Sequence, residues 1–261
     1  MGELSINQYT IVADLFSLML AATGVAAVFF FLQRGEVLQR YRMGITLLGL
    51  TCMVSSYSYY RLYTSWTDAF HVVNGASGSS GAMFNEGCRF VDWLLTVPLL
   101  LVAFLSTMDL GSRQMRLRST VLAVLAAEMI LLGYPGQLAT TVEARVLWWI
   151  VAMLPALILV YQLFVGLNPA IKAEPLAARK LFRVARLLIV SSWTIYPAAA
   201  LLSIFGFAGP TTFTAIQVGY AAADALAKVA CGVVLLRAAA QKSEPVEEIV
   251  PLAGTLRVGM S

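Results

Sequence analysis

Two apolar segments of the chain carry polar and charged residues in patterns that could do chemistry. The first contains Arg89, Asp92 and Thr96, spaced three and four residues apart. The second contains Asp224 and Lys228, four residues apart. Residues at these spacings share one face of a helix. Ionisable groups inside apolar helices are costly and indicate function. We expect the two faces to meet, so that two cations balance two carboxylates.

A lysine in apolar surroundings can do chemistry that an exposed lysine rarely does. Its amine can condense with an aldehyde to form a Schiff base. Once protonated, that linkage is a fixed cation, and Asp92 and Asp224 could provide its counterions. The alternative is a structural salt-bridge network that only joins two helices, and the spacing alone leaves both interpretations open. The chemical interpretation requires a cofactor that carries a carbonyl group.

The composition indicates an integral membrane protein. Of the 261 residues 59% are apolar and 12% are charged, whereas soluble domains use about 25% charged residues. Apolar runs that do not alternate exclude a β-barrel. We predict an all-α bundle of seven transmembrane helices in one domain at 1–238, then a disordered cytoplasmic tail at 239–261. Helices long enough to span about 30 Å of hydrocarbon are expected near 8–33, 42–63, 87–107, 116–134, 142–166, 181–205 and 211–238.

The positive charges gather in alternate loops. Lys and Arg residues cluster near 34–42, 113–118 and 172–186, whereas the opposite loops hold only Arg61 and Arg145. Because short basic loops stay on the cytoplasmic side, we expect the N-terminus outside and the C-terminus inside. The formal net charge of +4 then reflects topology and gives no reason to expect a nucleic-acid partner. The cysteines lack the spacing of a disulfide scaffold or a zinc site.

At these residues the chain resembles the microbial rhodopsins. The strings CRFVDWLLTVPLL (88–100), WTIYPAAA (193–200) and DALAKVA (224–230) are similar to that family's helix signatures in order and spacing. VFFFLQR (28–34) and LLGYPG (131–136) resemble the proteorhodopsin branch. The likeness extends over nearly the whole chain, apart from one outer loop and the C-terminal tail. It implies a bundle of the microbial rhodopsin type that binds all-trans retinal.

The resemblance also implies a role for each residue of the motifs. Lys228 would carry all-trans retinal as a Schiff base, Asp92 would accept its proton, and Asp224 would be the second counterion. Arg89 would tune both carboxylates from the outer side, and Thr96 would form a hydrogen bond near Asp92. The residues expected around the chromophore are Tyr59, Trp93, Leu100, Met129, Gly133, Trp149, Trp193, Tyr196 and Pro197.

Three positions distinguish this chain within the family it resembles. Outward proton pumps of that family usually carry a carboxylic donor eleven residues after the acceptor, about 16.5 Å along the helix, and here that position is Ala103. Ser58 stands where many proteorhodopsins keep a histidine. Leu100, at the position of spectral tuning, resembles the green-absorbing type. Reprotonation must therefore use water or another group, or run slowly.

The expected function is a light-driven outward proton pump in the cell membrane and not an enzyme. The expected partners are retinal, protons, the lipid bilayer and further copies of the chain in a pentamer or hexamer. Two alternatives stay open because Ala103 cannot donate a proton: a slow-cycling sensory rhodopsin, and an inward pump or channel. A chloride pump is disfavoured because Asp92 is an acid.

Two acids outside these motifs also need an interpretation. Glu86 lies one turn outward of Arg89 and is either part of a proton-release group or a solvated loop acid. Glu128 directly precedes Met129 and should point away from the retinal, so it is either a contact between protomers or an internal proton group.

The outer loop near 64–86 contains the turn-forming string at 74–81, which suits a hairpin or a flexible loop. Asp68 and His71 in this loop are either simply exposed or form a pH-sensitive or metal-binding contact; we predict no metal site in the protein. Asp14, two turns into the first helix, is expected to be a polar cap at its outer end.

Overall fold

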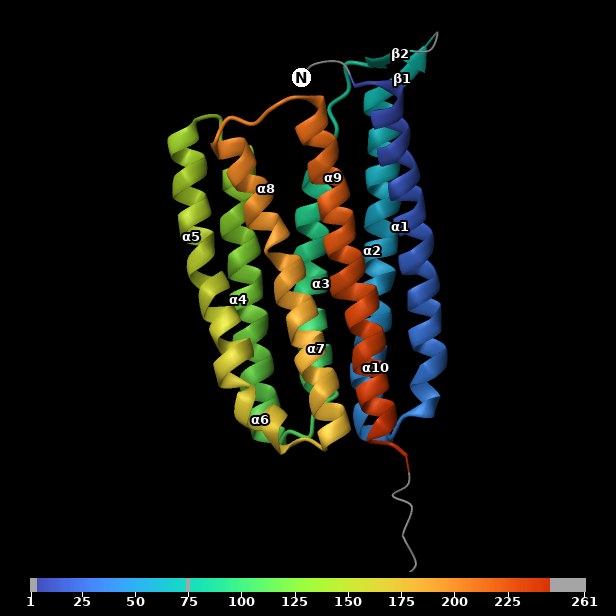
Figure 1. Cartoon of the computed structure of the whole chain (residues 1–261), viewed down its shortest axis with the longest axis vertical. Helices are drawn as coiled ribbons and strands as arrows, with labels where there is room; N and C mark the ends of the chain where they lie inside the picture. The colour runs from blue at the N-terminus through green and yellow to red at the C-terminus, as the bar shows by residue number, and fades with distance from the viewer. Residues whose placement is uncertain (1–3, 74–75, 245–261) are drawn as a thin grey trace, which may run out of the picture.

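The computed structural model describes residues 4–73 and 76–244, which form seven long helical spans side by side (Figure 1). Four spans are single helices: α1 (Ile6–Gln33), α2 (Arg42–Ala69), α3 (Gly87–Ser106) and α4 (Ser112–Leu138). The other three are built from consecutive pieces: α5 (Val142–Tyr161), η3 (Gln162–Gly166) and α6 (Asn168–Ala173); α7 (Leu176–Trp193) and α8 (Ile195–Ile204); α9 (Pro210–Asp224), η4 (Ala225–Ala230) and α10 (Cys231–Gln241). The predicted all-α bundle is confirmed.

Six of the seven spans in the described part of the chain are long and apolar enough to cross a membrane. The exception is α2, which packs against α1 and α3 but carries Ser55, Tyr59 and Arg61 among its residues. Ser55 and Tyr59 lie on its buried side. The span predicted at 42–63 is therefore present as a helix, and part of its inner face lines the site described below.

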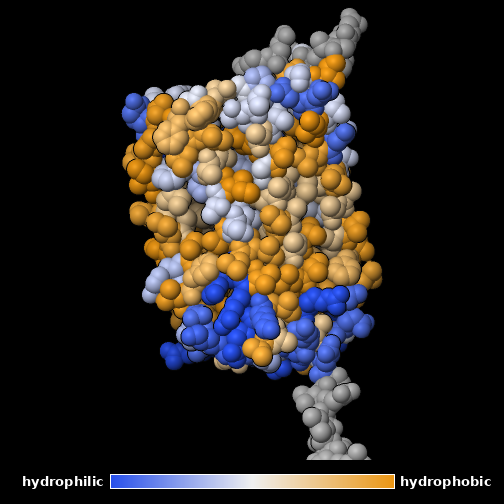
Figure 2. Space-filling view, viewed as in Figure 1, coloured by the Kyte–Doolittle hydropathy of each residue, from blue (hydrophilic) through white to orange (hydrophobic). Residues whose placement is uncertain are grey.

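The two ends of the bundle differ in character. At one end, called here the hairpin end, β1 (Phe70–Val73) and β2 (Ala76–Ser79) pair antiparallel, with Phe70 opposite Ser79. The hairpin alternative for this loop is thus the correct one, although residues 74–75 lie outside the described part. Hydrophilic side chains gather at the opposite end, the basic end, below a broad hydrophobic band (Figure 2).

An ion-pair cluster joins three helix connections and the end of α10 at the basic end. The Lys242 ammonium lies 2.7 Å from Glu174 Oε2 and 3.2 Å from Asp109 Oδ2, and it donates to the Thr107 carbonyl oxygen at 3.0 Å. The Tyr41 hydroxyl donates to Asp109 at 2.7 Å. The Lys242 and Glu174 side chains are each 2% exposed. Helical order thus reaches past the predicted start of the tail, and residues 245–261 lie outside the described residues.

The chain between α7 and α8 bends where the sequence carries Pro197. α7 ends at Trp193 and α8 begins at Ile195. Proline has no N–H, so Pro197 cannot bond to the carbonyl of Trp193 four residues earlier, and the ladder is interrupted there. The bend lies at the level at which Tyr196 meets Asp224 on α9.

Candidate functional site

Lys228 lies between two carboxylates in the interior of the bundle. Its ammonium donates to Asp92 Oδ2 on α3 and lies 3.1 Å from Asp224 Oδ1 on the preceding turn of its own span. The side chains of all three residues are only 3% exposed. The predicted meeting of the two charged faces is therefore what the structure shows, and one buried cation is shared by two acids.

The turn that carries Lys228 is a π-helix, not an α-helix. η4 begins directly after Asp224, and α10 resumes at Cys231. A π turn widens the helix locally and is common where function requires a special side-chain position. The spacing of four between Asp224 and Lys228 predicted a shared face but gave no sign of this widening.

Asp224 accepts hydrogen bonds from three aromatic side chains. Tyr59 on α2 donates to Oδ2 at 2.8 Å, Tyr196 on α8 to Oδ1 at 2.8 Å, and the Trp93 indole on α3 to Oδ1 at 3.3 Å. Charge-assisted bonds of this kind stabilise an ionised carboxylate. Asp224 thus collects donors from three other helices: Tyr59, which was expected near the two acids, and Trp93 and Tyr196, which were expected around the chromophore, all donate to this one carboxylate.

Asp92 has a smaller set of donors. Besides Lys228, only Ser55 on α2 reaches its carboxylate among the described residues, with a bond of 2.9 Å to Oδ1. Thr96 donates instead to the Asp92 backbone carbonyl at 2.9 Å. Sequence reasoning missed Ser55, although its spacing of four from Tyr59 put both on one face. Ser58, the expected counterpart of the histidine, is buried but donates no hydrogen bond to Asp92.

Arg89 forms no ion pair with either carboxylate in the described structure. Its Nη2 donates to the Gln217 side-chain carbonyl at 2.6 Å, and Gln217 Nε2 donates to Glu86 at 2.6 Å. Gln137 donates to the other oxygen of Glu86 at 2.8 Å. A chain of polar groups thus runs from Arg89 to Glu86 at the hairpin end. Gln217, which is fully buried, was not predicted; its position seven residues before Asp224 was the available signal.

The Arg89 guanidinium is enclosed by aromatic rings. Its Cζ lies 5.3 Å from the Phe16 ring centroid and 5.2 Å from the Tyr220 ring centroid. Two of its nitrogens, Nε and Nη1, are buried and have no hydrogen-bond partner among the described residues. Buried donors without protein partners are sites where ordered water is expected. Arg89 therefore separates the lysine and its acids from the hairpin end.

The expected chromophore-lining residues come from α2, α3, α4, α5, α7 and α8. The Trp93 and Tyr196 rings lie 4.5 Å apart, and the Trp149 indole donates to the Pro197 carbonyl at 3.2 Å. Met129 and Trp193 are half-buried and pack against the core. Gly133 has room for an added Cβ, which would lie 3.9 Å from Phe90 and Ala152, and Leu100 is buried.

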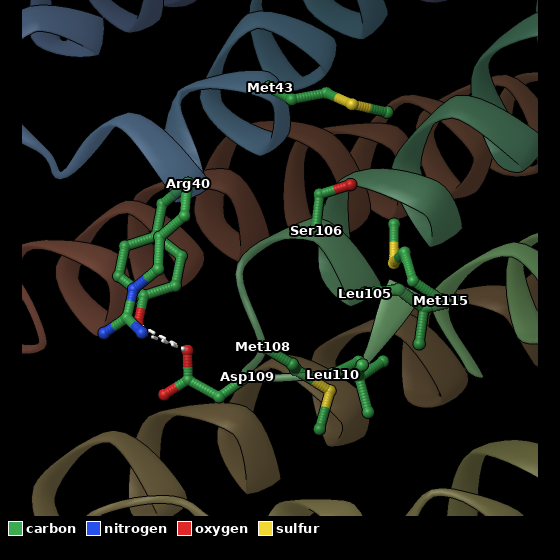
Figure 3. A pocket seen from close by; sticks show the side chains of 10 residues that line it. Arg40, Met43, Leu105, Ser106, Met108, Asp109, Leu110 and Met115 are labelled. Atoms are coloured by element: carbon green, nitrogen blue, oxygen red, sulfur yellow. Dashed lines mark hydrogen bonds and ion pairs between the residues drawn. The ribbon is translucent and has the colours of Figure 1, made fainter. Parts of the chain in front are cut away.

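A cavity of about 420 Å³ opens at the basic end, beside the start of α2, the end of α3 and the start of α4. Figure 3 shows Arg40 and Asp109 joined on one side of it, where the ion pair measures 3.4 Å. Ser106 lines the cavity, whereas Ala103, one turn deeper in α3, is fully buried and does not. The position expected to hold a proton donor is thus closed off by apolar packing.

The histidine and three further acids that the sequence analysis discussed lie away from this site. His71 pairs with Gly78 in the hairpin, and the Asp68 carbonyl accepts from Ser80. The described residues contain no group of three ligands that could hold a metal ion. Glu128 on α4 is exposed on the outside of the bundle, as is Asp14 on α1.

Comparisons of the sequence and of the structure with known proteins point to the same family. Residues 11–242 match the family model described as bacteriorhodopsin-like protein. The chain is 25% identical to the green-light absorbing proteorhodopsin of Gamma-proteobacterium EBAC31A08, over 93% of this chain and 91% of that protein. Its structure resembles that of xanthorhodopsin, described as a light-driven ion pump with dual chromophore, with a TM-score of 0.90 and 35% identity over 93% and 97% of the two chains.

A second solved structure, that of thermophilic rhodopsin, superposes with a TM-score of 0.90 and 33% identity, over 93% of this chain and 98% of the other. The family match covers most of the sequence, and both structural matches cover nearly all of each chain. The chain therefore belongs to the bacteriorhodopsin-like family and is a multi-pass membrane protein.

Proposed function

We propose that this chain is a light-driven outward proton pump that holds all-trans retinal as a protonated Schiff base on Lys228. The observation that carries the proposal is the buried position of the Lys228 amine between Asp92 and Asp224. An exposed surface ion pair would not need two acids, three hydroxyl groups and an indole from neighbouring helices. Relatives with matching folds include a protein described as a light-driven ion pump.

The residues present fit a retinal group. The amine is enclosed, so a covalent bond to an aldehyde would be protected from water, and two carboxylates balance the resulting cation. Trp93 and Tyr196 lie against the acids on one side. The half-buried Trp149 and Trp193 supply further aromatic surface from α5 and α7. When bound, retinal would supply the absorption of light and a change of shape that moves the proton-bearing nitrogen.

The difference between the two acids assigns their roles. Asp224 accepts from three aromatic donors and is well stabilised as an anion, whereas Asp92 has a single neutral side-chain donor, Ser55. The acid with fewer donors gains more from taking up a proton. Asp92 is therefore assigned as the proton acceptor, and Asp224 as the counterion that remains ionised.

Release would follow the polar chain toward the hairpin end. Once Asp92 is neutral, the Arg89 guanidinium is balanced by fewer negative charges, and its link through Gln217 reaches the Glu86 carboxylate. Glu86 is assigned as part of the release group. With the basic loops on the cytoplasmic side, the hairpin end and the N-terminus face outward, and a proton leaving past Glu86 is pumped out of the cell.

Return of a proton to the Schiff base from the basic end would have no carboxylic donor. Among the described residues the buried carboxylates are Asp92, Asp224 and Glu174, and Glu174 is held by Lys242 at the far end of the bundle. Ala103 offers no proton. We assign the refilling step to water that enters from the cavity beside Ser106, so the rate of return to the resting state should depend on the pH of the medium at the basic end.

The deciding experiment illuminates unbuffered vesicles of known protein orientation, reconstituted with retinal, and records pH with and without a protonophore. Movement of protons from the basic end to the hairpin end, abolished by the protonophore, supports the proposal. Movement in the reverse direction would make the protein an inward pump. A coloured protein that moves no protons and recovers over seconds would instead be a sensor.

A further inference from the structure

One charged side chain at the end of α10 contacts three helix connections at the basic end. These connections are 34–41 between α1 and α2, 107–111 between α3 and α4, and 174–175 between α6 and α7. The Lys242 side chain reaches all three and is only 2% exposed. A lysine near a membrane surface normally extends its ammonium group into the water, so the burial of this one calls for a physical reason.

Contacts from the three connections hold the ammonium group in place. It lies 2.7 Å from Glu174 Oε2 and 3.2 Å from Asp109 Oδ2, and it donates to the Thr107 carbonyl oxygen at 3.0 Å. The Tyr41 ring centroid is 4.5 Å from Lys242 Nζ, which is within the range of a cation–π contact. The Asp109 backbone N–H donates to Glu174 Oε1 at 2.7 Å. The two acids are therefore joined to each other as well as to the lysine.

An aromatic pair lies against the same ammonium group. The Phe182 ring centroid on α7 is 5.5 Å from Lys242 Nζ. Phe182 packs edge-on against Phe104 on α3, with 5.6 Å between the ring centroids. Both rings are fully buried, as is Ala103, which directly precedes Phe104. The lysine thus covers the apolar packing that closes off position 103.

The residues around the lysine also form part of the wall of the basic-end cavity. Tyr41 and Asp109 both line it, and Figure 3 shows the Asp109 carboxylate turned toward Arg40 at its edge. Ser106 lines the cavity too, and Ala103 lies one turn deeper in α3. Water in the cavity is therefore separated from the interior of the bundle by the lysine and by the aromatic pair.

Charged contacts suit a closure that opens and shuts repeatedly. Apolar side chains of similar volume often stabilise a fold as well as a buried ion pair does, or better, so stability alone does not explain this cluster. When an ion pair separates near the surface, each charge recovers its hydration, whereas separated apolar groups lose free energy in water. Because a single ammonium group contacts all three connections, its withdrawal would release them together.

We propose that Lys242 is a latch: its ammonium group holds the three connections over the aromatic pair, and its release opens the interior of the bundle to water from the basic-end medium. Lys242 lies 14 residues after Lys228, about 20 Å along the same span. It is therefore a positioning residue that acts through the groups it holds. Its part in refilling rests on the proposed function, whereas the closing of the basic end does not.

Chemical access to position 103 tests the latch without retinal. The full chain carrying Ala103→Cys is purified in mild detergent and treated with a small water-soluble methanethiosulfonate, and peptide mass spectrometry follows the modification of each cysteine. We expect Lys242→Met, which keeps the length of the side chain but removes its charge, to raise the rate at the introduced cysteine roughly tenfold or more through local opening. The native Cys88, at the hairpin end of the same helix, should react at an unchanged rate.

A second variant and a control accompany this measurement. Glu174→Gln weakens the same contacts with little change of shape and should also raise the rate at position 103. Lys172→Met removes an exposed lysine from the same end and should leave both rates as they are. Far-UV circular dichroism verifies folding. An unchanged rate at position 103 in folded Lys242→Met and Glu174→Gln would overturn the latch, and so would an equal rise at Cys88, which would show general loosening.

Flash recovery of the retinal-bound protein tests the part that concerns refilling. If opening of the latch limits the entry of water, recovery in Lys242→Met should quicken roughly threefold or more at the same pH of the basic-end medium. Faster modification at position 103 with unchanged recovery would exclude the latch from the refilling step. A protein that neither becomes coloured nor moves protons would overturn the proposed function, and the modification rates would still decide whether Lys242 closes the basic end.

Discussion

The Ser55 hydroxyl on α2 donates to Asp92 Oδ1 on α3 at 2.9 Å, and among the described residues no other neutral side chain reaches that carboxylate. The bond is fully buried, since Ser55 has no exposed surface. It lies on the same face of α2 as Tyr59, which serves Asp224 in the same way. The two acids therefore receive one hydroxyl each from α2, and only Asp224 receives further neutral side-chain donors.

Replacing Ser55 by alanine should make Asp92 easier to protonate. A hydrogen bond to a charged group contributes about 1.5 to 3 kcal/mol, and a shift of one pH unit corresponds to about 1.36 kcal/mol. In the retinal-bound protein the colour change that accompanies Asp92 protonation should move up by roughly one to two pH units in Ser55→Ala. Absorbance titration measures the midpoint. Ser58→Ala is the matched control, and an equal shift in both variants would contradict the specific role of Ser55.

Substitutions of Lys228 should change both the colour and the stability of the protein, and the two effects can be measured separately. Lys228→Ala should stay colourless with retinal and should lose about 3 to 5 kcal/mol of stability, because it leaves two buried carboxylates without a cation. Lys228→Arg should also stay colourless but retain more of the stability, since the charge persists. Visible absorbance and thermal unfolding measure the two effects. Colour of wild-type intensity in either variant is incompatible with a covalent chromophore on Lys228.

The sequence predicted the parts of this site that follow from run length and helical spacing. Long apolar runs define the spans, and spacings of three and four define which face Asp92 and Asp224 share with their neighbours. The meeting of these faces followed from charge balance. The break after Trp193 followed from Pro197, because a missing N–H interrupts a helix wherever it occurs.

Other features depend on which distant residues become neighbours. Nothing in the local sequence distinguishes Ser55 or Gln217 from other polar residues. They belong to the site only because α2 places Ser55 against Asp92 and α9 places Gln217 against Arg89. Lys242 stands where a disordered tail was expected, and it is buried because Glu174 and the end of α3 converge on it. A local pattern cannot reveal such contacts, which join residues 37 to 135 positions apart in the chain.

The link from Arg89 to Glu86 predicts two different kinetic defects. Glu86→Gln keeps a polar group of the same size but removes the titratable proton, so rapid release to the hairpin-end medium should be lost. Gln217→Leu should delay release because Arg89 and Glu86 no longer share a bridge. A pH-sensitive dye with flash excitation times the release. Gln137→Leu, which removes only the outer bond to Glu86, is the control and should have a smaller effect.

Unchanged release in Glu86→Gln would exclude this acid from the release group. The chain from Arg89 through Gln217 would then serve only to position the guanidinium. The same variant should still show normal colour, because Glu86 lies away from Lys228 and its counterions.

Asp109 makes the basic end sensitive to acid. Burial alone would raise the pKa of Asp109, but the hydrogen bond from Tyr41 and the charge of Lys242 outweigh it and lower the pKa below its usual value. A lowered pKa means that its stabilising contribution is present above the usual value, near 3.9, and is lost as the pH falls through the folded-state value. Because the side chain is 42% exposed, this contribution should stay below about 1 kcal/mol.

Thermal unfolding measured between pH 6 and pH 3 tests whether ionised Asp109 contributes to the stability. The wild type should lose more stability over that range than Asp109→Asn, with a difference of a few degrees at most. Equal losses in the two proteins would show that other carboxyl groups control the acid response. Glu36→Gln, at an exposed acid of the same end, is the control and should behave like the wild type.

A carboxylate introduced at position 103 should supply the proton donor that this chain lacks there. Ala103 is fully buried in α3, eleven residues after Asp92, so Ala103→Glu places an acid on the same face between the basic-end cavity and the lysine. A positioned proton donor accelerates transfer by about 10² or more. Recovery after a flash should therefore quicken at least tenfold and depend less on the pH of the medium at the basic end. Ala103→Gln, which has the same size but no acidic proton, should recover like the wild type or more slowly, and equal acceleration by both variants would show that polarity and water, not a missing donor, limit the refilling step.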